Sequence, residues 1–242
     1  MKIMSDKQIL AKLRIRATKG DVESMWLLGT AYLNGSFECV QPRRNVVVEK
    51  SDARARRWLR KAAEAGSTGA MLDLASLIFQ KGVESASADA RKECFEAAYF
   101  WERRAWRHGE TLAAWNLAIT CSAFGKRKAC FGWLCRAAEI DVDSLCGKAL
   151  CYAVGYGVRK DLERARKIMH DLLRNRRMRT VADADFVRRL NRLLCEEITV
   201  VIKEPFTKML EGEMHDYFAQ PCRRSVPEPR HSQVCRTRPE EI

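Results

Sequence analysis

Apolar and small residues recur along the chain with the spacing of paired helices. In four segments a small residue is followed three positions later by a bulky apolar residue, and successive segments lie roughly 32 to 43 residues apart. These anchor pairs are Ala55/Trp58, Ala98/Trp101, Cys130/Trp133 and Ala165/Ile168. Such spacing is typical of repeats that contain two helices each. The pattern therefore predicts four copies of one helical unit.

A second pattern precedes each anchor. A small residue is followed at +4, +5 and +8 by apolar, small and apolar or aromatic residues, and these offsets share one face of a helix. The copies are Ser24/Leu28/Gly29/Tyr32, Ala70/Leu74/Ala75/Ile78, Ala113/Leu117/Ala118/Cys121 and Ser144/Lys148/Ala149/Tyr152. Because small side chains let a neighbouring helix approach closely, each unit is predicted to be a pair of helices packed on each other.

The connection inside the fourth copy carries the most specific motif of the chain. Its key residues are Tyr152, Gly155, Gly157, Val158, Asp161 and Ala165. This motif resembles the Sel-one-like repeats, relatives of the tetratricopeptide repeats, and the first copy matches both ends of the same pattern. The resemblance covers roughly residues 20–175. It implies an all-α fold, a right-handed α-α superhelix (an α-solenoid) of about four helix pairs with capping helices.

The chain divides into four predicted regions. They are an N-terminal capping helix (1–19), Sel-one-like repeats (20–180), C-terminal capping helices (181–218) and a disordered basic tail (219–242). The first repeat contains an inserted loop, Ser36 to Lys50, and the second a smaller insertion, Glu84 to Lys92. The third repeat is shortened between Gly125 and Cys130.

The composition favours binding over catalysis. The chain has ten cysteines but no C-x2-C pair, and none of its four histidines lies in a metal or nucleophile motif. We therefore predict no catalytic residues, no cofactor and no metal site. The chain start lacks the apolar core of a secretion signal, and no run of 18 apolar residues is present, so a cytoplasmic location without membrane contact is predicted.

Positive charge is the second signal. The net charge is +13. Residues 159–192 hold 12 lysines and arginines against 5 acidic residues, and residues 41–61 hold 8 against 2. Such regions attract acidic partners, whether protein or nucleic acid. The residues expected to contribute most are Arg43, Arg44, Arg174, Arg176 and Arg177.

One helix face is the predicted binding surface. On the first helix of each unit, the +2 position points away from the packed face, and in helical-pair solenoids the first helices line the concave side. The predicted partner-binding residues are Trp26, Thr30, Leu72, Ser76, Trp115 and Ile119, continued in the fourth unit by Cys146 and Leu150. The alternative is that Trp26 and Trp115 pack on neighbouring helices.

These features predict a non-catalytic protein-interaction scaffold or adaptor that binds an acidic protein through its concave face. Two alternatives remain open. One is an immunity protein that neutralises a co-encoded bacterial toxin, a use to which the family resemblance points. The other is a nucleic-acid binder that works by charge, an alternative that rests on charge alone because the sequence shows no recognised nucleic-acid module.

Overall fold

The computed structural model describes residues 5–40, 43–140 and 142–174. All of these lie in the first of the two units into which the chain divides, residues 1–200 and 201–242. The predicted C-terminal capping helices (181–218) and basic tail (219–242) lie outside the described residues, as do Arg176 and Arg177.

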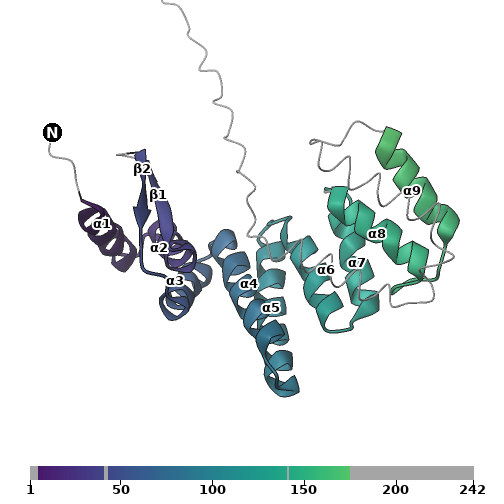
Figure 1. The fold of residues 1–242 in the computed structure, drawn as a ribbon, viewed down its shortest axis with the longest axis horizontal. Coiled ribbons are helices and arrows are strands. Elements are labelled where there is room, and N and C mark those ends of the chain that lie inside the picture. The colour runs from purple at the N-terminus through teal and green to yellow at the C-terminus, as the bar shows by residue number, and fades with distance from the viewer. Residues whose placement is uncertain (1–4, 41–42, 141, 175–242) are drawn as a thin grey trace, which may run out of the picture. The chain divides into compact units, whose positions relative to one another are not determined.

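The described chain is a succession of helices with one β-hairpin (Figure 1). The elements are α1 (Asp6–Thr18), α2 (Val22–Asn34), β1 (Ser36–Val40), β2 (Arg43–Val47), α3 (Asp52–Glu64), α4 (Thr68–Glu84), α5 (Ala88–Arg107), α6 (Ala113–Ala123), α7 (Arg127–Ala137), α8 (Val142–Val154) and α9 (Leu162–Arg174). Each helix packs on the next, and the first helices α2, α4 and α6 also contact one another in turn. The predicted α-solenoid of helix pairs is confirmed.

The small residues of the repeat pattern lie where helices come closest. The four anchors Ala55, Ala98, Cys130 and Ala165 are all buried. At Gly29 of α2, an added Cβ would lie 2.6 Å from the side chain of Leu59 on α3. Helices α2 and α3 can pack at this distance because position 29 has no side chain.

The segment predicted to be an inserted loop forms a hairpin instead. β1 and β2 pair antiparallel, with Phe37 opposite Val46. Val46 and Val48 are buried, whereas Val47 between them is 73% exposed. This alternation is the pattern of a half-buried strand, and the buried side joins the core cluster that contains α1 and α2. The hairpin is the one departure from an all-helical fold among the described residues.

The second predicted insertion also takes a different form. Instead of a loop around Glu84 to Lys92, α4 continues to Glu84 and α5 starts at Ala88. The hydroxyl of Ser87 caps α5 by accepting a hydrogen bond from the backbone NH of Ala90. The additional residues therefore lengthen α4 and α5, so that α5 has 20 residues and α7 has 11.

The first and fourth repeats share a tyrosine arrangement. The carbonyl oxygens of Tyr32 and Tyr152 accept hydrogen bonds from the NH groups of Ser51 (2.9 Å) and Asp161 (2.8 Å), the residues directly before α3 and α9. Each ring also lies under an arginine of the following helix, Arg54 at 5.6 Å and Arg164 at 4.8 Å from the ring centroids. The two copies most similar in sequence are thus built alike.

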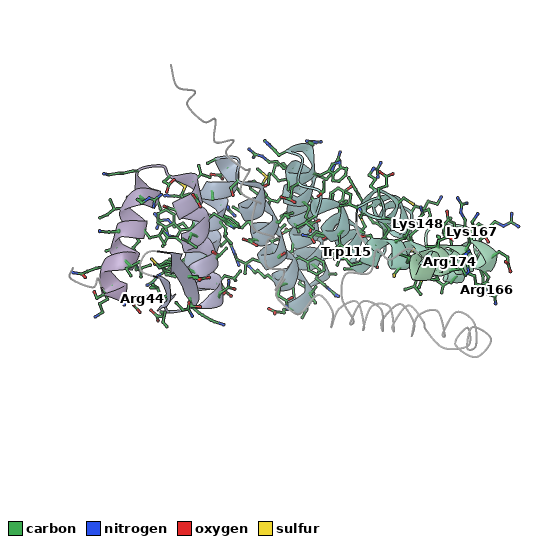
Figure 2. All side chains as sticks on the ribbon, turned by 90° about the horizontal axis from the view of Figure 1, so that it is seen from above. Arg44, Trp115, Lys148, Arg166, Lys167 and Arg174 are labelled. Atoms are coloured by element: carbon green, nitrogen blue, oxygen red, sulfur yellow. The ribbon has the colours of Figure 1, made fainter. Side chains whose placement is uncertain are left out.

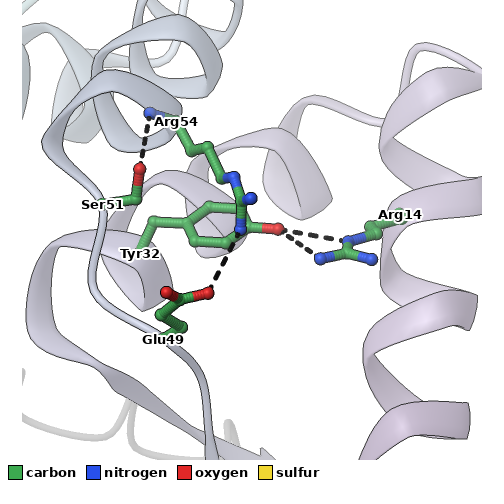
Figure 3. A network of polar contacts seen from close by, with 5 residues as sticks. All are labelled: Arg14, Tyr32, Glu49, Ser51 and Arg54. Atoms are coloured by element: carbon green, nitrogen blue, oxygen red, sulfur yellow. Dashed lines mark hydrogen bonds and ion pairs between the residues drawn. The ribbon is translucent and has the colours of Figure 1, made fainter.

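Tyr32 has one contact that Tyr152 lacks among the described residues. Its hydroxyl accepts hydrogen bonds from Nε (3.1 Å) and Nη2 (2.6 Å) of Arg14 on α1 (Figure 3). We expect Tyr32→Phe to lower the free energy of unfolding by about 1–3 kcal/mol, because a charge-assisted hydrogen bond in a half-buried site is lost. Urea denaturation measures the change. Tyr152→Phe is the matched control, and an equal loss in both variants would contradict the assigned role of Arg14.

Candidate interaction surface

Trp26 lies at the junction of the first two repeats. Its indole Nε1 donates a 2.6 Å hydrogen bond to Oδ2 of Asp73 on α4. The ring covers Gly69, where an added Cβ would lie 2.8 Å from the indole Cζ2. Nevertheless Trp26 remains 37% exposed. The residue therefore links α2 to α4 and presents one edge to solvent.

Trp115 has a similar neighbour in the next helix pair. Its Cζ3 lies 3.8 Å from the position that a Cβ at Gly147 of α8 would occupy. Trp115 and Ile119 are half-buried. Both tryptophans thus pack on a glycine of another first helix, as the alternative interpretation of the sequence predicted.

The remaining predicted residues differ in exposure. Ser76 is exposed, Leu72 and Thr30 are half-buried, and the Thr30 hydroxyl donates to the carbonyl oxygen of Leu27 at 3.1 Å. The sequence predicted that the surface continues onto α8 in the fourth repeat. This prediction is wrong, because Cys146 and Leu150 are buried. We call Trp26, Thr30, Leu72, Ser76, Trp115 and Ile119 the first-helix row.

The basic residues named from the sequence belong to separate places. Arg44 of β2 forms an ion pair with Asp6 of α1. Arg174 is exposed at the end of α9, beyond Arg166 and Lys167 on the same helix (Figure 2). Arg43 begins β2, and its side chain is outside the described part. The basic regions thus lie on the first and fourth repeats as distinct surfaces.

Comparisons with known proteins agree with this architecture. A Sel1 repeat protein from Oxalobacter formigenes superposes with a TM-score of 0.56 and 16% identity, over 88% of this chain and 80% of that one. A second match is c5321, a protective antigen of uropathogenic Escherichia coli strains that displays an SLR fold. Its TM-score is 0.53 and its identity 20%, over 91% of this chain.

The chain has the Sel-one-like repeat fold. It spans 46% of the length of the Escherichia coli protein, a little under half. No protein-family model matches the sequence, and no curated protein matches it either.

Charge is divided between the two helices of each Sel-one-like pair. Each of the second helices α3, α5, α7 and α9 carries three to five lysines and arginines. In contrast, α2 and α6 carry none, and α4 and α8 carry one each. The first helices are therefore poor in cations, and most cations lie on the other helix of each pair.

The anchor tryptophans show a regularity that the sequence interpretation missed. A cation three residues later lies over each ring: Lys61 over Trp58 (5.0 Å), Arg104 over Trp101 (5.5 Å) and Arg136 over Trp133 (4.7 Å). Residues three apart are neighbours on a helix surface, so the spacing W-x2-[KR] was a readable signal. These contacts shield the outer side of the repeat core.

A carboxyl group is buried between α5 and α6. Glu102 is 3% exposed, and its Oε1 accepts a 2.8 Å hydrogen bond from the Thr120 hydroxyl. Its Oε2 has no hydrogen-bond partner among the described residues. Burial raises the pKa of Glu102 to about 8, against the opposing effect of the Thr120 hydrogen bond. The sequence held a signal of this burial, because Glu102 occupies the repeat position at which the first and third repeats have the buried Leu59 and Leu134.

The cysteines near this carboxyl are poor candidates for chemistry. Burial raises the pKa of Cys121 to about 11 and that of Cys130 to about 12, and it raises the pKa of Cys151 further. Their thiols stay protonated at neutral pH, whereas a nucleophile or metal ligand must be a thiolate. In the described ranges no group of three potential metal ligands is present, and no helix is long and apolar enough to cross a membrane.

Proposed function

We propose that this chain is a non-catalytic scaffold that binds another protein through the first-helix row. The observation that carries the proposal is the uncharged, partly exposed row on three consecutive first helices, with an indole edge at each of two repeats. Aromatic residues that are rigidly packed and partly exposed are favoured anchors in protein interfaces. Trp26 fits this description because α4 holds its ring in place.

The cations on the second helices support an acidic partner. With a net charge of +13, the chain attracts anionic surfaces at long range. Complementary charge mainly raises the association rate, whereas desolvated apolar contacts slow dissociation. The cationic second helices are therefore suited to steering an acidic partner towards the chain, and the first-helix row is suited to retaining it.

The described cysteines support a reducing compartment for this scaffold. Among the described residues, Cys94, Cys121, Cys130, Cys135 and Cys151 are free thiols. Proteins of oxidising compartments tend to pair their cysteines, whereas cytosolic thiols remain reduced. We therefore propose that the interaction takes place in the cytoplasm.

A charged substitution in the row tests the proposal. Ser76 is exposed, so Ser76→Glu adds bulk and negative charge at the centre of the row without removing a buried contact. We expect the variant to lose a specific protein that the tagged wild-type chain retains from a native lysate through a high-salt wash. The expected loss is at least tenfold, because a charge buried in an interface without a partner costs several kcal/mol.

Ala86→Glu is the matched control, since Ala86 is a small, exposed residue in the connection between α4 and α5, outside the row. It adds the same charge and should retain the partner. Equal retention by both variants would remove the row from the interface. Recovery of nucleic acid alone, eluting steeply with salt, would instead favour the charge-driven alternative.

A further inference from the structure

A small pocket lies on the second-helix side of the second repeat. Its volume is about 250 Å³. It is lined by Phe95, Glu96, Tyr99, Phe100, Arg103 and Arg107 of α5 and by Lys126 at the start of α7. We call it the α5 pocket. It shares no residue with the first-helix row.

Unequal helix lengths bring the start of α7 to one end of this pocket. Trp101 is the fourteenth residue of α5, whereas its counterpart Trp133 is the seventh residue of α7. In the repeat alignment α7 therefore begins opposite Phe95, and the first two turns of α5 have no counterpart on α7. One end of the pocket lies at this step, where Lys126 ends the short connection and has its Nζ 4.8 Å from the centroid of the Phe95 ring.

The floor of the α5 pocket is aromatic. Phe95 is buried and packs on Phe124 with ring centroids 4.3 Å apart, and on Tyr99 at 5.8 Å. Phe100 is 56% exposed, an unusual position for so large an apolar side chain. It stands edge-on to Trp101 at 5.2 Å. A further aromatic ring can pack here edge to face.

The rim of the α5 pocket is cationic. Arg103 and Arg107 are exposed one helical turn apart, and Lys126 faces them from the start of α7. In the part of the chain that the structure describes, none of the three forms an ion pair with a carboxylate. Arg103 instead lies over the ring of Tyr99 at 5.8 Å. Against these three cations the rim holds one acid, Glu96.

We propose that the α5 pocket binds an acidic-aromatic segment of another protein, in which one aromatic side chain is flanked by carboxylates. The volume, below the roughly 300–1,000 Å³ of small-molecule sites, suits a single side chain rather than a cofactor. The ring enters against Phe95, Tyr99 and Phe100. The flanking carboxylates pair with Arg103 and Arg107, whose planar guanidinium groups suit bidentate contacts.

Labelled synthetic peptides test the proposal by fluorescence anisotropy on the full chain. The probe is a short peptide with one tryptophan between pairs of glutamates. Two reference peptides replace the glutamates by glutamine or the tryptophan by alanine. We expect each change to weaken binding roughly tenfold, which corresponds to about 1.4 kcal/mol, because each removes one of the two kinds of contact. The double variant Arg103→Glu/Arg107→Glu should weaken binding of the acidic peptide by at least as much.

Arg60→Glu is the control variant, since Arg60 is exposed on α3, outside the α5 pocket. It should change the affinity less than about threefold, an amount set by overall charge. Equal losses in Arg60→Glu and the double variant would overturn the proposal, as would equal binding of the glutamate and glutamine peptides. The proposal would also be overturned if a single-stranded oligonucleotide bound in a way that requires Arg103 and Arg107 while the peptide did not bind. Self-association of the chain that requires the same two arginines would overturn it too.

Discussion

Gly157→Ala should strongly destabilise the junction of the third and fourth repeats. Gly157 has φ +73°, in the left-handed region, which costs a residue with a side chain about 1–2 kcal/mol. An added Cβ would also lie 2.1 Å from the carbonyl oxygen of Arg127, a backbone atom at the start of α7. Relieving this overlap requires a shift of the helix, which costs about 1–3 kcal/mol more. We expect the free energy of unfolding to fall by roughly 2–5 kcal/mol, measured by urea denaturation with far-UV circular dichroism.

Gly155→Ala separates the two contributions. Gly155 also has a left-handed backbone, φ +77°, but a Cβ there would lie 3.4 Å from Lys160, an ordinary contact. This variant should therefore lose only the conformational part, about 1–2 kcal/mol. Equal losses in the two variants would mean that the connection between α8 and α9 does not press on α7 as the structure has it.

The same turn explains why this repeat carries so specific a motif. Tyr156, between the two glycines, is buried, and Arg127 of α7 lies over its ring at 5.4 Å. Its hydroxyl lies 3.1 Å from the Ser122 Oγ at the end of α6. The motif therefore does more than reverse the chain, because it also fixes the fourth repeat against the third.

The helix pairs were predictable because their determinants are local. Each buried anchor, such as Ala55, Ala98 or Cys130, shares one helix face with the bulky residue three positions later. This period of 3.6 residues can be recognised from neighbouring residues alone. The hairpin was missed for a related reason. Val46, Val47 and Val48 are all apolar, so the sequence does not show the alternation in burial that the structure has, and the segment read as a loop although its buried side faces α1 and α2.

The binding surface was less predictable because it depends on distant partners. The hydrogen-bond partner of Trp26 is Asp73, which lies 47 positions further along the chain. No local sequence pattern around either residue predicts this pair. Cys146 is buried although its helical position matches that of the half-buried Trp115. The α5 pocket likewise requires Lys126 to meet a helix whose length the repeat pattern does not set. Period and spacing thus predict which helix faces pack, whereas exposure depends on how the next repeat covers them.

Glu102→Gln should remove a pH dependence from the stability of the chain. Because the pKa of Glu102 rises from 4.5 to about 8 on folding, the folded state holds a proton that the unfolded state releases between these values. The wild-type chain is therefore most stable relative to the variant below pH 4.5 and loses stability as the pH rises towards 8. The loss has an upper bound of about 5 kcal/mol, since one unit of pKa corresponds to about 1.36 kcal/mol.

Urea denaturation at about pH 5 and about pH 8 in reducing buffer measures the effect as a difference between wild type and variant. Both values lie below the raised pKa values of Cys121 and Cys130, so thiol ionisation in the folded state does not contribute. Glu96→Gln, at an exposed position of the same helix, should keep the wild-type dependence on pH. If Glu102→Gln kept it too, the carboxyl would be ionised in the folded state. A charge at a position where the sister repeats bury leucine would then need a partner close to Oε2.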